Sequence, residues 1–367
     1  MFSTSKHRIS FYLAKKHPFI CVYAFFVVPL RGKRKKTSER MGIKSFLKSD
    51  YHTKKHKFHK WLHRNDWEKK HSPSLFSRIR NEIYYNLHSK DCLVVDGWLV
   101  RFYESEDKYM NWGDDLNVYL LERMTNKKII PLKTLLFRKF RCRYLVIGSV
   151  IPNCLHKKAI VWGAGVMDGK QKLSTPPKAI LAVRGPLTRN YFIGKGIDCP
   201  EVYGDPALLL PIFYTPRNKN KKYKITIIPH HRDFDDEKLV TQLTHREGIH
   251  VINMANYVSW WDVVDEICQS EVVLSSSLHG LIVSDAYGVP NQFVEYCYHH
   301  PNYDKYKDYY LSVNERFIPP PVVQLFEFDV CELVTLAENV LRKYKRPNMN
   351  IEPLIKSCPF EILEMEL

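Results

Sequence analysis

Short apolar runs alternate with amphipathic stretches over most of the chain, and many of the runs end at a glycine or a serine. Apolar runs of four to six residues with no period of two are typical of parallel strands that are buried on both faces. The first series of patterns predicts helices over 111–124 and 186–196, a turn over 202–211, and strands within 92–98, 99–105, 127–132, 143–149, 159–165 and 178–185. This order predicts an α/β unit built on a parallel sheet.

The same alternation restarts after the polar segment 215–224, which we interpret as an interdomain linker. This second series predicts helices over 236–246, 257–269, 278–287 and 329–346, and strands within 224–231, 249–254, 271–277 and 291–296. The predicted fold class is therefore α/β, with two doubly wound Rossmann-like domains, 91–214 and 225–346, that face each other across a cleft. A C-terminal tail, 347–367, follows them.

The formal net charge of +17 lies in an N-terminal extension, residues 1–90, which holds 22 Lys and Arg against 5 Asp and Glu. Within it, the 13-residue apolar segment Pro18–Leu30 lies between lysines and the basic run Arg31–Lys36. The segment is too short to span a bilayer as a helix. An apolar segment with basic flanks predicts an anchor on an anionic membrane surface. The alternative that the protein starts at Met41 stays open.

The nine cysteines show no CxxC motif and no spacing with histidines that is typical of zinc sites. This distribution argues against a disulfide scaffold and a metal site, and it predicts a reducing, cytoplasmic compartment.

The most informative stretch is Leu274–Pro290, in which an apolar strand stops at the serines Ser275, Ser276 and Ser277 and a helix then begins with His279 and Gly280. Free N–H groups at a helix N-terminus favour an anion, and a histidine there suits proton transfer. The alternative is that Ser277 caps the helix and that His279 is merely exposed.

The turn at the start of the predicted helix 111–124 places Asn111, Gly113, Asp114 and Asp115 together. One of the two aspartates is expected to cap the helix. The other is expected to act as a general base or to bind sugar hydroxyls.

Further candidates follow the predicted strands. Gly163 and Gly165 form a Gly-x-Gly turn that lacks the rest of a dinucleotide fingerprint. Arg184 ends a strand, where its planar fork would match a carboxylate or phosphate, and a surface salt bridge is its alternative role. Asp205 lies in a turn that we expect near the cleft.

His230 and His231 end another strand, and since adjacent side chains on a strand alternate in direction, at most one of them is expected to face the cleft. Glu295 is the carboxylate that a nucleotide-sugar enzyme would need for ribose.

Six motifs occur in the order seen in one family: NWGDDLN, WGAG, VRGPLTR, GDPALLLP, IPHH, and SSSLHG followed by DAYGVPNQFVEY. Over roughly residues 92–315 the chain thus resembles the polysaccharide pyruvyl transferases. The resemblance implies a fold similar to GT-B glycosyltransferases and the transfer of pyruvate from phosphoenolpyruvate onto two sugar hydroxyls, without a cofactor or metal. Family members commonly have Arg-Leu-His where this chain has Ser277, Leu278 and His279. The role of that arginine in holding the donor then falls to Arg184, Arg189, His230 or the helix N-terminus.

We therefore expect a cytoplasmic, membrane-associated pyruvyl transferase that acts on a cell-surface polysaccharide or its lipid-linked precursor. A cationic His279 would be the acid, Asp114 would orient or deprotonate the hydroxyl, and Arg184 with the Ser275–Ser277 turn would hold the donor. The alternatives are a glycosyltransferase that uses a nucleotide sugar, and a nucleic-acid-binding protein that uses residues 1–90. No nucleic-acid partner is expected, because residues 91–367 carry no net charge.

Overall fold

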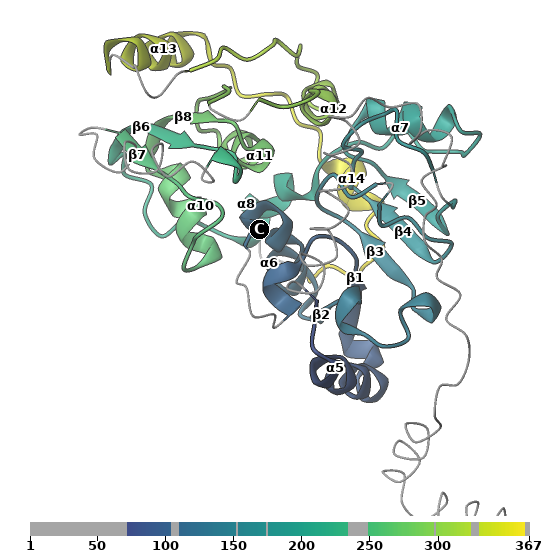
Figure 1. The fold of residues 1–367 in the computed structure, drawn as a ribbon. Coiled ribbons are helices and arrows are strands. Elements are labelled where there is room, and N and C mark those ends of the chain that lie inside the picture. The colour runs from purple at the N-terminus through teal and green to yellow at the C-terminus, as the bar shows by residue number, and fades with distance from the viewer. Residues whose placement is uncertain are drawn as a thin grey trace, which may run out of the picture. The chain divides into compact units, whose positions relative to one another are not determined.

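The computed structural model describes residues 72–103, 110–151, 153–173, 175–233, 249–296, 299–323 and 330–363. Residues 65–367 belong to one compact unit, which contains two parallel sheets (Figure 1). The apolar segment 18–30, Met41 and the predicted helix 236–246 lie outside the described residues.

The first sheet has the strand order β2-β1-β3-β4-β5, and all its strands are parallel. Its elements are α5 (Leu75–Leu87), β1 (Cys92–Val95), α6 (Trp112–Thr125), β2 (Lys128–Pro131), β3 (Arg143–Leu145), β4 (Ala159–Trp162), β5 (Ala179–Ala182), α7 (Pro186–Ile193) and α8 (Leu210–Phe213). The inner strands β1, β3 and β4 are mostly buried, which is why their sequences read as apolar runs, whereas the edge strand β5 is only partly buried.

The second sheet is also parallel, with the order β7-β6-β8-β9. Its elements are β6 (Tyr223–Ile228), β7 (Ile249–Val251), α10 (Trp260–Cys268), β8 (Ser270–Ser275), α11 (Leu278–Tyr287), β9 (Asn291–Phe293), α12 (Asp304–Ser312) and α13 (Val330–Lys343). Helix α13 covers the face that carries Ile225 and Ile227, whereas α10 and α11 pack on the face of Ile228 and Val273 (Figure 1). The prediction of parallel α/β units is confirmed.

Two local predictions are wrong. Leu99–Ser105 was expected to be a strand, but Val100–Tyr103 forms a 3₁₀-helix. Side chains three residues apart lie on the same side of a 3₁₀-helix, so Val100 and Tyr103 are both buried in the core. The Tyr103 hydroxyl donates a hydrogen bond to the Gly97 carbonyl. In place of the predicted turn over 202–211, Pro206–Leu209 forms a 3₁₀-helix that leads into α8.

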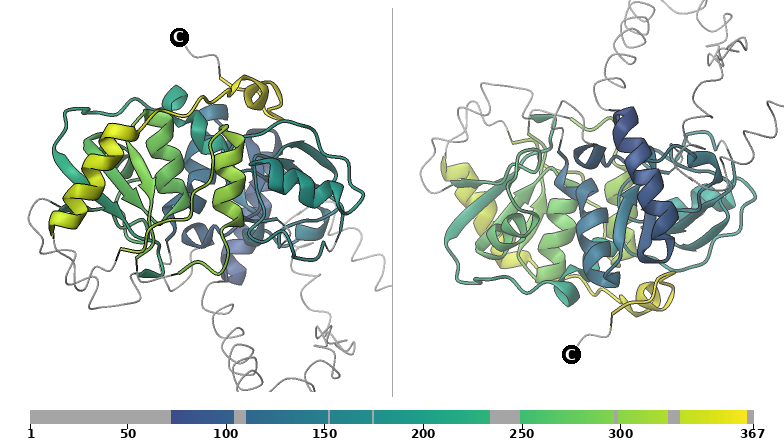
Figure 2. Two further views of the ribbon diagram at one scale, coloured as in Figure 1. Left: turned by 90° about the horizontal axis from the view of Figure 1, so that it is seen from above. Right: turned by 90° about the horizontal axis from the view of Figure 1, so that it is seen from below.

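The two sheets share one apolar core. The indole N–H of Trp112, at the start of α6, donates a hydrogen bond to the Trp260 carbonyl of α10 (2.9 Å). The view from above shows the helices of both sheets side by side (Figure 2). Strand β6 begins at Tyr223, inside the predicted linker 215–224. The division into domains at that segment stays a prediction.

The C-terminal segment packs on the first sheet. Helix α14 (Glu352–Lys356) follows α13 and buries Leu354 completely. The indole N–H of Trp162, at the end of β4, donates to the Leu354 carbonyl (3.0 Å). The ring of Phe360 meets Trp162 and Tyr144 edge to face. Residues that were predicted to be a tail therefore complete the core around the first sheet.

We expect Leu354→Ala to lower the free energy of unfolding by about 2–5 kcal/mol, because it leaves a cavity in a fully buried position. Urea unfolding measures this change. Leu363→Ala is the control, since that side chain is 47% exposed and its loss should cost little. Equal small effects at both positions would contradict the packing of this segment.

Candidate active site

A cavity of about 380 Å³ lies where the two sheets approach each other, beyond the carboxyl ends of several strands. Segments of both sheets line it: Trp98, Asn111, Asp114, Ser149, Asn153, Met167 and Gln171 from the first, and His230, His231, Arg232, Met254, Ser277, Leu278, His279 and Lys305 from the second. Seven of these residues belong to the sequence-predicted motifs, and Arg232 adjoins one of them.

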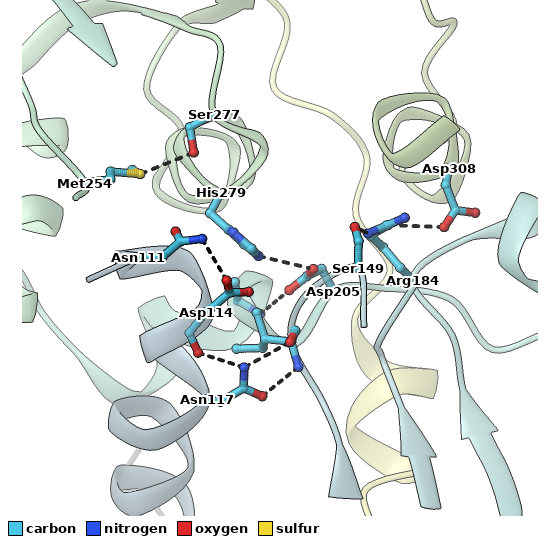
Figure 3. A network of polar contacts seen from close by, with 12 residues as sticks. Asn111, Asp114, Asn117, Ser149, Arg184, Asp205, Met254, Ser277, His279 and Asp308 are labelled. Carbon is cyan, nitrogen blue, oxygen red and sulfur yellow. Dashed lines mark hydrogen bonds and ion pairs between the residues drawn. The ribbon is translucent and has the colours of Figure 1, made fainter. Parts of the chain in front are cut away.

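The turn between β8 and α11 brings His279 into this cavity (Figure 3). The Ser275 hydroxyl accepts a hydrogen bond from the Ser277 N–H (3.0 Å) and donates to the Ser277 carbonyl (2.9 Å), which fixes the turn. Ser277 occupies the N-cap position, but its hydroxyl donates to the sulfur of Met254 rather than capping the helix. His279 is only 9% exposed. The alternative of a serine cap with an exposed histidine is therefore wrong.

His279 packs between Gly113 and Asp205. A Cβ at Gly113 would lie 1.9 Å from Nδ1 of His279, so only glycine leaves room for the ring. On the other side, Nε2 lies 3.9 Å from Oδ2 of Asp205, and within the described structure neither atom has a hydrogen-bond partner. Both atoms are thus buried polar groups that face each other beyond hydrogen-bond distance.

The electrostatic surroundings keep His279 neutral at pH 7. Burial, together with the nearby cations of Arg184 and Lys305, lowers its pKa to about 3. Burial raises the pKa of Asp205 to about 6. Without a ligand, His279 is therefore a neutral imidazole, where the sequence predicted a cation.

Asp114 lies on the cavity wall in the first turn of α6 (Figure 3). Its Oδ2 accepts a hydrogen bond from the Asn111 amide (2.7 Å). Asn117 donates to the Asp114 carbonyl (2.8 Å) and to the Ile147 carbonyl (2.9 Å), which ties this turn to the end of β3. Burial and the charge of Asp115 raise the pKa of Asp114 to about 7, so this carboxyl can exchange a proton near neutrality.

Asp115 points away from the cavity. It is 1% exposed and accepts a hydrogen bond from the Tyr257 hydroxyl (2.7 Å), while its Oδ1 has no partner among the described residues. Asn111 occupies the N-cap position, so the expectation that one of the aspartates caps the helix is wrong. Asp115 joins the two sheets instead of binding in the cavity.

Asp115→Asn is expected to stabilise the protein at high pH and not at low pH. Burial raises the pKa of Asp115 to about 7 from 3.8, so the stability that the protonated carboxyl contributes is present below about pH 4 and is lost as the pH rises through about 7. The neutral amide avoids this loss, and we expect a gain of roughly 1–3 kcal/mol at about pH 8. Urea unfolding at about pH 4 and at about pH 8 measures this gain in the free energy of unfolding. Asp91→Asn is the control, since the Asp91 side chain is exposed. A gain of equal size at both pH values would refute this explanation.

Arg184 is completely buried behind the cavity wall. Its Nε donates to Oδ2 of Asp308 (3.2 Å), Nη1 to the Ser149 hydroxyl (2.7 Å) and Nη2 to the Val166 carbonyl (2.7 Å) (Figure 3). A surface salt bridge is therefore the wrong interpretation. Arg184 itself does not line the cavity, but its hydrogen-bond partner Ser149 does. The guanidinium is therefore not open to direct contact with a ligand.

The opposite wall carries His230, His231, Arg232 and Lys305. His230 and His231 both line the cavity, so the expectation that only one would do so is wrong. Strand β6 ends at Ile228, and the alternation of a strand does not extend to these residues. Burial lowers the pKa of His230, and it lowers that of His231 to about 4.

Lys305, near the start of α12, is a functional candidate that the sequence did not reveal. It is 7% exposed and lines the cavity, and its ammonium lies 4.9 Å from the centre of the Tyr306 ring. Burial and the charge of Arg184 lower its pKa to about 7. The stretch Asp304–Tyr310 carries no glycine and no strand end, so no local signal marked it.

The remaining predicted residues lie near the cavity without lining it. Gly163 has a φ of +91°, and a Cβ there would lie 2.2 Å from Pro206. Asp205 accepts a hydrogen bond from the Ala207 N–H (3.0 Å). Gly165 and Gly280 lie where the backbone packs closely on Arg184 and Ser275.

Ser276 and Glu295 do not line the cavity themselves. The Ser276 hydroxyl accepts a hydrogen bond from the His230 N–H (2.6 Å). Glu295 is 2% exposed and accepts from the His300 N–H (2.8 Å) and the Tyr303 hydroxyl (3.1 Å), away from the cavity. Among the described residues, no group of three or more His, Cys, Asp or Glu side chains could hold a metal ion. In the same part of the chain, we find no helix whose length and apolar character would let it cross a bilayer.

Two parallel sheets and a cavity lined by Asp114, His279, Arg232 and Lys305 define an α/β protein with a polar site. A sequence model of the polysaccharide pyruvyl transferases matches residues 12–298, and the chain belongs to this family. It is 29% identical over 198 residues to the succinoglycan biosynthesis protein ExoV of Rhizobium meliloti (strain 1021), which covers 51% of this chain and 57% of ExoV. It is 26% identical over 193 residues to the uncharacterized protein L143 of Acanthamoeba polyphaga mimivirus, with coverages of 52% and 65%. The match thus spans less than two thirds of each relative.

Solved structures give weaker similarities. A functionally uncharacterized protein, KP1_0663 from Klebsiella pneumoniae subsp. pneumoniae NTUH-K2044, aligns with a TM-score of 0.36 at 14% identity, over 67% of this chain and 98% of that one. The UDP-GlcNAc 2-epimerase of Methanocaldococcus jannaschii aligns with a TM-score of 0.38 at 12% identity, with coverages of 76% and 78%.

Proposed function

We propose that the protein transfers pyruvate from phosphoenolpyruvate onto two hydroxyls of a sugar in a cell-surface polysaccharide or its lipid-linked precursor. The observation that carries the proposal is the cavity itself, in which Arg232 and Lys305 share the lining with His279 and with Asp114, a carboxyl whose pKa of about 7 suits proton exchange. Membership of the family supports it. The predicted arrangement of two domains across a cleft and the cytoplasmic location are parts of this proposal.

The chemistry requires one proton to be added and two to be removed. Protonation of the methylene carbon of the enol phosphate gives an oxocarbenium-like centre, which the first sugar hydroxyl attacks with loss of its proton. Departure of phosphate regenerates such a centre, and the second hydroxyl attacks it and loses its own proton. One hydroxyl proton thus replaces the proton that went to the new methyl group, and the other leaves with inorganic phosphate.

The donor is assigned to the wall that contains His231, Arg232 and Lys305, beside the N-terminus of α11. Its negative charges oppose the effect of Arg184 and Lys305 on His279 and raise the pKa of that imidazole. The bound donor would thereby convert His279 into the acid that protonates the methylene carbon. Asp205, at 3.9 Å, would stabilise the resulting imidazolium, and Asp114 would accept the hydroxyl proton.

The sugar is assigned to the opposite, uncharged wall, which Trp98, Asn153, Met167 and Gln171 form. The Trp98 side chain is 37% exposed, and an indole offers an apolar ring to the face of a sugar. Amide side chains suit hydroxyls because each supplies donors and an acceptor. Asp114 lines the same cavity as the residues to which we assign the donor and the sugar.

Thermal and urea unfolding in the presence of phosphoenolpyruvate test the proposal. At 100 times its dissociation constant, the donor should add about 2.7 kcal/mol to the free energy of unfolding. Lys305→Met should abolish most of this gain, whereas Lys307→Met, on the same helix and outside the cavity wall, should retain it. A nucleotide sugar that stabilises the protein in place of phosphoenolpyruvate would overturn the assignment of the donor.

A further inference from the structure

Helix α5 turns its apolar stripe toward the solvent. Phe76, Ile83 and Leu87 recur at helical spacing, and their exposed fractions are 75%, 46% and 73%. The buried positions of the same helix are the polar Ser77 and Glu82. In the view from below, α5 lies on the outside of the described body, and no other described helix or strand covers it (Figure 2). The helix therefore directs these three apolar side chains to the solvent and its polar Ser77 and Glu82 toward the protein.

The buried side of α5 is fixed by polar contacts. The Glu82 carboxylate accepts hydrogen bonds from the Leu136 and Phe137 N–H groups (2.9 and 3.3 Å) and pairs with Arg141. Tyr84 and Tyr85 pack against the apolar cluster of β1 and β2. The helix cannot rotate its stripe inward without breaking these contacts.

The segment beside α5 extends the same surface. Phe137 and Phe140 are 56% and 72% exposed, and between them lie the exposed Arg138 and Lys139. Burial and the nearby guanidinium of Arg138 lower the pKa of Arg78 on α5. We call this surface the α5 face and define it by Phe76, Arg80, Ile83, Leu87, Phe137, Arg138, Lys139 and Phe140.

We infer that the α5 face docks on an anionic lipid bilayer. Its charged groups are basic, so a second copy of the same face would meet like charges across a twofold interface. The N-terminal residues of the chain are also basic, so like charges disfavour them as the segment that covers the α5 face. An anionic bilayer complements the charge, and a helix lying in the interface buries Phe, Ile and Leu at the acyl boundary while Arg and Lys contact the phosphates.

Co-sedimentation of the full-length protein with vesicles of phosphatidylglycerol or phosphatidylcholine tests this inference. The triple variant Phe76→Gln, Ile83→Gln, Leu87→Gln should bind phosphatidylglycerol vesicles at least about tenfold more weakly, because three exposed apolar side chains are lost from the interface. The matched control is Val258→Gln, Ile318→Gln, Leu341→Gln, whose side chains are 88%, 71% and 44% exposed elsewhere, and it should bind like the wild type. Hydrogen exchange should slow at the amides of α5 when phosphatidylglycerol vesicles are added.

Two results would overturn the inference. Undiminished binding of the α5 triple variant, with no slowing of exchange in α5, would assign membrane binding to other residues. A concentration-dependent dimer that light scattering detects and that the triple variant abolishes would assign the face to a second copy. Either result would leave the proposed transfer reaction untouched, since phosphoenolpyruvate binding is measured without vesicles.

Discussion

His279→Gln should reduce turnover about 100-fold or more, the usual effect of losing a group that transfers a proton. Glutamine can still form hydrogen bonds beside Asp205, but it cannot donate a proton to carbon. Steady-state kinetics with phosphoenolpyruvate and an acceptor measure the loss, and donor affinity should change much less than turnover. Near-normal turnover of this variant across the neutral pH range would rule out proton transfer by His279.

Gly113→Ala tests the same role without touching the histidine. The new Cβ would lie 1.9 Å from Nδ1 of His279, so the ring must move, and we expect a loss of turnover close to that of His279→Gln. Gly97→Ala is the control, because the nearest atom to its Cβ, Cγ1 of Val150, is 3.7 Å away. Similar activity of the two alanine variants would show that the position of the His279 ring does not matter.

Asp308→Asn should lower the free energy of unfolding by about 3–5 kcal/mol, because it leaves Arg184 as a buried cation without its partner. The carboxylate also accepts hydrogen bonds from the Thr188 N–H (2.9 Å) and hydroxyl (2.6 Å). Asparagine keeps the shape but offers a single acceptor oxygen to these three donors. Urea unfolding at neutral pH measures the change.

Glu201→Gln provides the comparison for an exposed ion pair. Arg189 and Glu201 lie 3.1 Å apart with side chains that are 26% and 70% exposed, so water screens the pair, and the variant should lose less than about 1 kcal/mol. If Asp308→Asn cost as little, the Arg184–Asp308 pair would not be what holds α7 to α12.

Local signals were sufficient for the helix that carries His279. Its strand, its three serines and its Gly288 end are neighbours in the sequence, and Gly288 adopts the left-handed conformation (φ +70°) that ends many helices. The same reasoning placed Asn111 and Asp114 on the cavity wall. It failed at Leu99–Ser105, where an apolar run forms a 3₁₀-helix, because apolar composition alone does not distinguish a short strand from a helical turn.

The partners of the site residues could not be predicted because they are distant in the sequence. Arg184 was expected to bind the donor directly, but its guanidinium is held by Asp308, 124 residues later. Lys305 enters the cavity only through the packing of α12, and Trp98 through a loop that was expected to be a strand end. Sequence patterns predict which side chains follow the ends of the strands, but their contact partners depend on tertiary packing.

The contact between Trp162 and the C-terminal segment constrains the order in which the nascent chain can fold. The indole of Trp162 and the carbonyl of Leu354 are 192 residues apart, a distance that a ribosome covers in about 10–40 s at about 5–20 residues per second. Once β5 has been made, the first sheet has its strands but lacks the segment that covers Trp162 and Tyr144. The nascent protein must therefore keep an aromatic surface accessible, and the last step in folding its first half occurs when nearly all of its second half has been made.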